Sequence, residues 1–163
     1  MLIAIITSSA TEQPITTHES IEVIAKVGLA GDRYATGNGF YSGMSEWDAH
    51  VTLIQQEPFD LLAAEHGVQL DPKELRRNLV TRGVNLYSLI GREFRIGQQV
   101  VLRARKAWPP CSHIVQFSGR VEIFKYLAKQ CGIGADVLVG GTIRVGDAIV
   151  VEEKPAAGQG SVD

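Results

Sequence analysis

The sequence predicts one mostly β domain with a few α-helices, folded as a closed or nearly closed barrel. The chain has 163 residues, which suits one ordinary domain with a real hydrophobic core. Short runs of β-branched residues, each bounded by glycine or polar residues, predict strands at 2–6, 21–27, 51–54, 100–102 and 143–151. Short strands joined by tight turns favour closure, because closure removes exposed sheet edges.

Two of the predicted strand segments share one pattern. Residues 94–102 read FRIGQQVVL and residues 143–151 read IRVGDAIVV, so the two segments align position for position. Each is predicted to form a tight hairpin. Gly97 or Gly146 would take the turn conformation that a side chain resists.

Helical spacing occurs at 58–66, which ends at Gly67, and at 120–130, which ends at Gly132. In the second helix, residues three and four apart predict one buried face. Its members are Val121, Phe124, Leu127, Ala128 and Cys131. This pattern places Cys131 in the core.

The domain is expected to span 1–153, followed by a flexible C-terminal tail at 154–163. The tail is rich in Pro, Ala, Gly and Ser and cannot bury enough surface to offset its ordering entropy.

The composition excludes several classes of partner. With 16 basic and 18 acidic residues, the net charge of −2 lacks the basic excess that nucleic-acid binding requires. The apolar opening at 1–6 has no basic start and is too short for a membrane span or an export signal. The two cysteines, Cys111 and Cys131, lack the paired spacing of a structural zinc site. Without an export signal or a disulfide framework, the expected compartment is the cytoplasm.

The first candidate site is the glycine-rich segment 28–39, which contains the pair Asp32 and Arg33. It matches neither the dinucleotide fingerprint nor the P-loop, because no helical pattern follows to hold a phosphate. One interpretation is a long surface loop. The other is a ligand site, since the glycines let a ligand approach the backbone while Asp32 and Arg33 orient each other or an anion.

The second candidate is the run 76–83, with Arg77, Asn78 and Arg82. Most arginine clusters are solvated patches, and this run fits that interpretation. The mixture of Arg with Asn and Thr also supplies donors suited to the oxygens of a phosphate.

The third candidate is Cys111, which follows Pro109 and Pro110. A lone cysteine is most often a small buried hydrophobe. Here, however, the neighbours are polar, and a basic strand at 103–106 leads into the thiol. Cations near a thiol favour the reactive thiolate. His113 is a candidate base or hydrogen-bond partner.

Taken in order, six motifs closely resemble those of the MOSC domain family, named after the C-terminal domain of molybdenum cofactor sulfurase. They are GLAGDR at 28–33, VTLI at 51–54 with Glu57, RRNLVTRG at 76–83, IGREFRIG at 90–97, Pro110–Cys111, and GGTIRVGD at 140–147. The resemblance runs from about residue 1 to 153.

The resemblance implies a MOSC-type β-barrel in which Cys111 is the reactive residue. This cysteine would carry sulfur as a persulfide or ligate molybdenum. Arg77 and Asn78 would hold the pterin phosphate of the molybdenum cofactor (molybdopterin). We expect Arg82, Asp32 and Arg33 to complete the cofactor contacts.

Two classes of function follow from the resemblance. In the first, Cys111 takes part in sulfur transfer or in molybdenum-dependent reduction of N-hydroxylated compounds, with electrons drawn from a separate reductase. The sulfur donor would be a cysteine desulfurase, so pyridoxal phosphate would enter only through that partner. In the second, the chain is a non-catalytic module that binds or hands over the cofactor.

Overall fold

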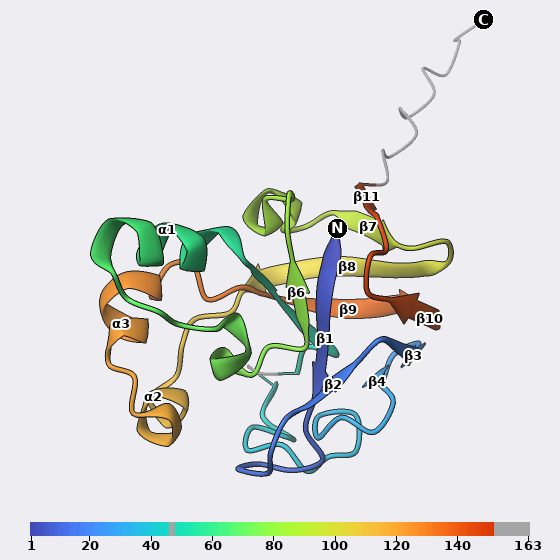
Figure 1. Cartoon of the computed structure of the whole chain (residues 1–163). Coiled ribbons are helices and arrows are strands. Elements are labelled where there is room, and N and C mark those ends of the chain that lie inside the picture. Colours follow the sequence, from blue (N-terminus) through green and yellow to red (C-terminus); the bar gives the residue numbers. More distant parts are fainter. Residues whose placement is uncertain (46–47, 152–163) are drawn as a thin grey trace, which may run out of the picture.

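The computed structural model describes residues 1–45 and 48–151 (Figure 1). The predicted tail and the last two residues of the predicted domain lie outside the described residues. The strands are β1 Leu2–Thr7, β2 Thr16–His18, β3 Ser20–Ile24, β4 Gly28–Leu29, β5 Val51–Gln55, β6 Leu79–Thr81, β7 Glu93–Ile96, β8 Val100–Ala107, β9 Ile133–Val139, β10 Gly141–Arg144 and β11 Ile149–Val151.

The helices are short, and the three α-helices gather on one side of the molecule (Figure 1). They are α1 Glu57–His66, α2 Ser112–Ser118 and α3 Glu122–Leu127, with 3-10 helices η2 Pro72–Leu75 and η3 Leu86–Leu89. Helix α1 begins with a proline in its first turn and ends at Gly67 in the left-handed conformation, as its sequence predicts. Among the described residues, none of the helices is long and apolar enough to cross a membrane.

The strands form two sheets. The larger has eight strands in the order β11-β7-β8-β9-β5-β6-β1-β2, and the smaller has the order β10-β3-β4. Neighbouring strands are antiparallel except for β5 and β6, which are parallel because α1 lies between them in the sequence and returns the chain to the same edge. The prediction of a mostly β domain with a few helices is therefore confirmed.

The predicted closure into a barrel is not confirmed. Backbone hydrogen bonds between segments of the two sheets do not form a shared ladder. Leu2 N donates to Asp147 O at 2.8 Å, and Lys26 N donates to Val137 O at 3.0 Å. Within the described residues, β10 and β11 belong to different sheets, so no continuous ladder runs around the core.

One of the two predicted hairpins is correct. Strands β7 and β8 pair antiparallel, with Ile96 opposite Val100, and Gly97 turns the chain at φ +64°. The second prediction was wrong, although Gly146 also has a positive φ. There β10 pairs with β3 and β11 pairs with β7, so the two strands diverge from the turn. The sequence pattern shared by 94–102 and 143–151 therefore determines the position of the turn but not the strand with which each segment pairs.

Two hydrophobic cores lie on opposite faces of the large sheet. The first fills the space between the sheets and joins Ile5 and Leu102 to Ile21 and Ile143 of the small sheet. The second lies between the other face of β1, β5 and β6 and the helices α1 and α3. Burial of an aliphatic side chain of this size contributes about 1.5–3 kcal/mol, so both cores contribute strongly to stability.

The second core contains Cys131, which is 1% exposed, so its predicted burial is confirmed. The predicted face of the helix was partly wrong: Leu127 is buried as predicted, but Val121 and Phe124 are 69% and 44% exposed, and Ile123 is buried in their place. The helix begins at Glu122, later than expected, and its short length makes the four-residue pair Ile123 and Leu127 the whole buried stripe.

Candidate functional site

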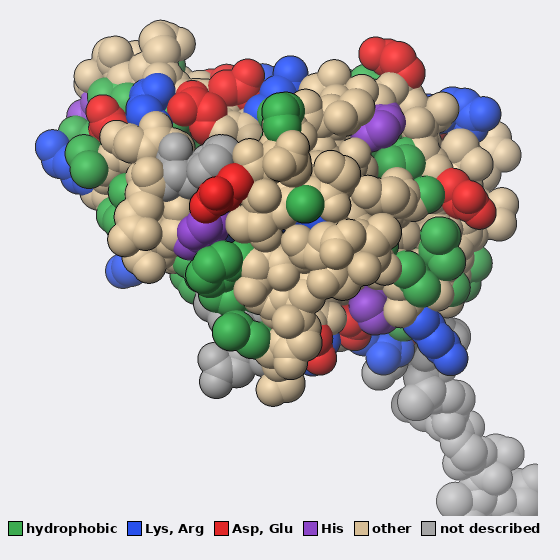
Figure 2. All heavy atoms as spheres, turned by 90° about the horizontal axis from the view of Figure 1, so that it is seen from below, with side chains coloured by type: hydrophobic (Ala, Val, Ile, Leu, Met, Phe, Trp, Pro, Cys, Tyr) green, Lys and Arg blue, Asp and Glu red, His purple; other side chains and the backbone are tan. Residues whose placement is uncertain are grey.

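A pocket lies where the loop after β4, the segment before β6 and the segment between β8 and α2 meet. Four of the six predicted site residues line it: Arg33, Arg77, Asn78 and Cys111. Arg76, Tyr41 and His113 also line it. Viewed from the side of these loops, basic and acidic side chains are interspersed over the described surface without a continuous basic region (Figure 2).

Cys111 is half-buried and occupies the N-cap position of α2. The segment that leads into it is anchored by Trp108, which is buried over the backbone of Gly134. A Cβ at Gly134 would lie 2.5 Å from the Trp108 ring, so only glycine lets β9 pass beneath it. Pro109 and Pro110 then stiffen the backbone between this anchor and the thiol.

Arg77 is buried and binds backbone rather than solvent. Its Nε donates to Cys131 O at 2.9 Å, and its Nη2 donates to Trp108 O at 3.3 Å and to Pro109 O at 3.1 Å. Burial lowers the pKa of the Arg77 guanidinium from its usual value, while the nearby thiols Cys131 and Cys111 oppose that change. Arg77 thus joins the segment between α3 and β9 to the segment that carries Cys111.

Asn78 is also buried, and its side chain makes hydrogen bonds within the protein. Its Oδ1 accepts hydrogen bonds from both Thr52 N and Thr52 Oγ1 at 3.0 Å. Its Nδ2 donates to Ile6 O at 3.3 Å. The side chain therefore links β5 to β1 across the start of β6.

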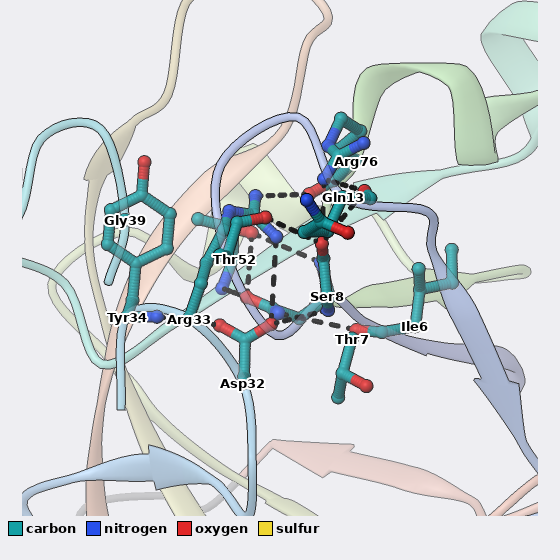
Figure 3. A network of polar contacts seen from close by, with 12 residues as sticks. Ile6, Thr7, Ser8, Gln13, Asp32, Arg33, Tyr34, Gly39, Thr52 and Arg76 are labelled. Carbon is teal, nitrogen blue, oxygen red and sulfur yellow. Dashed lines mark hydrogen bonds and ion pairs between the residues drawn. The ribbon is translucent and has the colours of Figure 1, made fainter. Parts of the chain in front are cut away.

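Asp32 is 2% exposed and orients the loop after β4. Its carboxylate accepts from Ser8 N and from Tyr34 N, both at 3.2 Å, and lies 3.6 Å from Arg33 Nη1 (Figure 3). Asp32 is consequently satisfied by the protein, and it holds Arg33 in place.

Arg33 and Arg76 lie together at the pocket although they are 43 positions apart in the sequence. Arg33 Nη2 donates to Arg76 O at 3.3 Å, and Arg76 Nη2 donates to Ser8 Oγ and to Gln13 O at 2.8 Å (Figure 3). Burial, and then the charge of Arg33, lower the pKa of the Arg76 guanidinium. Two neighbouring guanidinium groups repel each other, so an anion between them would be stabilised.

Arg82 does not line this pocket. It follows β6 and forms an ion pair with Asp60 of α1, with 2.8 Å between Nη1 and Oδ2. Both side chains are about half exposed. Arg82 was predicted to lie with Arg77 and Asn78 because the three are close in the sequence. Strand β6 lies between them, so Arg82 is at the opposite end of β6 from the other two.

Two aromatic residues of the pocket were missed by sequence analysis. Phe40 stacks on His113, with ring centroids 4.3 Å apart, and Tyr41 lines the pocket together with Cys111. Burial, followed by hydrogen bonding to Cys111 and the charge of Cys111, raises the pKa of Tyr41 to about 12. The available signal was a pair of aromatic residues between Gly39 and Gly43, in a segment otherwise typical of a loop.

The pocket is small. Its cavity is about 60 Å³, whereas sites for drug-sized ligands are roughly 300–1,000 Å³. A second cavity of about 300 Å³ adjoins it, and the two share Tyr34, Tyr41 and Ala49 as lining residues. Within residues 1–45 and 48–151, no three His, Cys, Asp or Glu side chains gather as a metal site would require.

The MOSC domain family model matches residues 31–150. The YuaD protein from Bacillus subtilis has a similar structure, with a TM-score of 0.73 and 16% identity over 93% of this chain and 96% of that one. YiiM from Escherichia coli has a TM-score of 0.63 and 15% identity over 94% of this chain and 70% of that one. YiiM from Geobacillus stearothermophilus also has a TM-score of 0.63 and 15% identity, over 95% and 76%. At these identities the structures show a shared fold. No curated protein matches the chain.

Proposed function

Because the chain belongs to the MOSC domain family, which is associated with proteins related to molybdenum cofactor sulfurase, we propose that it is a sulfur carrier in molybdenum-cofactor metabolism. Cys111 carries the sulfur as a persulfide. One observation supports this choice above the others: Cys111 lines the pocket beside arginine and tyrosine side chains, whereas the other thiol, Cys131, is buried in the core.

The proposed step is a thiol exchange. The thiolate of Cys111 attacks the outer sulfur of a persulfide on a cysteine desulfurase, and a bond forms between Cys111 Sγ and that sulfur. The bond between the donor cysteine and its outer sulfur breaks, and the donor cysteine leaves as a thiolate. No external oxidant or reductant is needed. Cys111 then passes the sulfur to an acceptor thiolate by the same exchange.

The surrounding residues have separate tasks in this proposal. Arg77 and Asn78 hold the strands and the segment that carries Cys111, because their donors and acceptors are used within the protein. Arg33 and Arg76 supply the contact for an anionic group of the acceptor, such as a phosphate. Arg82 has no part in the site, since it is paired with Asp60 away from the pocket.

The complete molybdenum cofactor does not fit this pocket as it stands. A cavity of about 60 Å³ accepts one added sulfur atom or a small anion but not a pterin. We therefore derive no step in which the cofactor or its metal takes part.

Mass spectrometry tests the proposal directly. The protein is incubated anaerobically with a cysteine desulfurase and free cysteine, and the gain of one sulfur atom on Cys111 is expected. Cys111→Ser should lose the adduct while its melting temperature stays close to that of the parent, since serine is nearly isosteric. Cys131→Ser is the matched control and should keep the adduct.

Three outcomes would contradict the proposal. The first is a Cys111→Ser variant that retains activity but is unstable, which would make Cys111 a core residue. The second is stoichiometric molybdenum after anaerobic purification without any persulfide, which would favour a molybdenum-dependent reductase. Absence of both sulfur and metal would leave the non-catalytic binding module.

A further inference from the structure

Arg33 keeps donors available for a ligand, unlike Arg77. Its side chain lines the smaller cavity and is only 12% exposed. A guanidinium carries five N–H donors. Within residues 1–45 and 48–151, the Arg33 guanidinium makes one hydrogen bond, from Nη2 to Arg76 O at 3.3 Å, and one ion pair, with Asp32 at 3.6 Å. Its other donors are therefore left for a bound anion.

The ring of Tyr34 supports the Arg33 guanidinium. Arg33 Cζ lies over this ring, 4.9 Å from its centroid (Figure 3). The backbone N–H of Tyr34 donates to Asp32 Oδ2 at 3.2 Å, so the carboxylate that pairs with Arg33 also fixes the backbone of Tyr34. Because a cation is attracted to the face of an aromatic ring, the guanidinium is held both by a carboxylate and by an aromatic face.

Gly39 lies against the Tyr34 ring and leaves it the space it occupies. Asn38 N donates to Arg33 O at 2.7 Å, which closes the loop and brings Gly39 back to the ring. A Cβ on residue 39 would lie 2.4 Å from Cε1 and 2.6 Å from Cδ1 of Tyr34. Real Cβ atoms do not approach other atoms that closely, so the ring would have to move. Gly39 is needed here for space alone, since its φ lies outside the left-handed region.

We propose that Tyr34 is a positioning residue for the anion site, whose ring, placed against Gly39, holds the Arg33 guanidinium where it meets the anionic group of the acceptor. The inference rests on the proposed function, in which Arg33 and Arg76 contact that group. It adds the reason why Arg33 is in place before the ligand arrives. Ordering a long side chain at the moment of binding costs affinity, and a guanidinium that is already ordered avoids this cost.

Calorimetry with inorganic phosphate tests the inference on the full chain. We expect Tyr34→Ala to bind phosphate roughly fivefold more weakly than the parent, because the attraction to the ring and the ordering of Arg33 are both lost. Tyr34→Phe keeps the ring and should bind within about twofold of the parent. Tyr126→Ala is the matched control. It removes a tyrosine of α3 that packs on His66 and does not line the pocket, so phosphate should bind as it does to the parent.

A double-mutant cycle separates positioning from a general loss of packing. Gly39→Ala should weaken phosphate binding as Tyr34→Ala does, since the added Cβ displaces the ring. In the double variant the ring is absent, so the change at Gly39 should cause no further loss. Additive losses would overturn the inference. So would a Tyr34→Ala variant that binds phosphate as the parent does, a Tyr34→Phe variant as weak as Tyr34→Ala, or a parent that binds no phosphate.

The two proposals fail separately, because neither Cys111 nor a persulfide takes part in phosphate binding. A parent that binds phosphate, with the losses expected for Tyr34→Ala and Gly39→Ala, supports the role of Tyr34. If that same parent acquires no sulfur from a cysteine desulfurase, the result contradicts the proposed sulfur transfer alone.

Discussion

Arg77 Nη2 donates a hydrogen bond to the carbonyl oxygen of Pro109 at 3.1 Å, two residues before Cys111. This bond joins a residue ahead of β6 to the segment between β8 and α2. Together with the bonds to Trp108 O and Cys131 O, it makes Arg77 a support of the pocket. The positive charge of Arg77 remains close to the Cys111 thiol, but most of the guanidinium N–H groups donate to backbone carbonyls.

The first prediction concerns stability. Arg77→Ala leaves three backbone carbonyls without their donor, and an unsatisfied buried acceptor costs about 1–3 kcal/mol. We expect the free energy of unfolding to fall by about 2–4 kcal/mol, measured by urea denaturation. Arg82→Ala is the matched control and should cost no more than about 1 kcal/mol, because its ion pair with Asp60 is exposed. Equal losses in the two variants would contradict the assignment.

The second prediction concerns anion binding. Arg33→Gln and Arg76→Gln each remove one guanidinium from the pair at the pocket and should weaken binding of inorganic phosphate roughly tenfold. Isothermal calorimetry measures the change. Arg82→Gln should bind as the parent does, and thermal unfolding should show that each variant is folded. Binding that depends on Arg82 but not on Arg33 would place the anion elsewhere.

The third prediction distinguishes the two thiols. Burial raises the pKa of Cys131 to about 11, and its Sγ donates to Leu127 O at 3.0 Å. At pH 8 the native protein should be alkylated at Cys111 well before Cys131, as followed by peptide mass spectrometry. Both should react in denaturant. Faster labelling of Cys131 in the native state would reverse the assignment of the reactive residue.

The fourth prediction is a pH titration. Burial, the hydrogen bond to Cys111 and the charge of Cys111 hold the pKa of Tyr41 at about 12, above its ordinary value of 10.0. Cys111→Ala removes the last two causes and keeps the first, so the Tyr41 pKa should fall part of the way toward 10.0. The difference in phenolate absorbance between each protein and its Tyr41→Phe partner isolates this group. An unchanged or higher Tyr41 pKa in Cys111→Ala would mean that the two side chains do not interact.

Several elements could be predicted from local pattern. The runs that begin at Leu2 and Val51 are strands, and α1 ends at Gly67 as its sequence indicates. Strand β9 was missed because Gly134 and Asp136 interrupt its apolar run. Helix α2 was missed because it has only seven residues, too few for a helical period to stand out.

By itself, the sequence determined the class of the domain, its family resemblance, and the contrast between Cys131 in the core and Cys111 outside it. These features depend on residue type and on local spacing in the sequence. Neither changes with the distant segments that pack against a residue in the fold. Only the tertiary structure decided which arginines reach the pocket. Arg33 meets Arg76 across 43 positions, while Arg82, close in sequence, pairs with Asp60 instead. A guanidinium carries the same charge everywhere, so its role is set by the acceptors that folding places around it, and those come from distant parts of the chain.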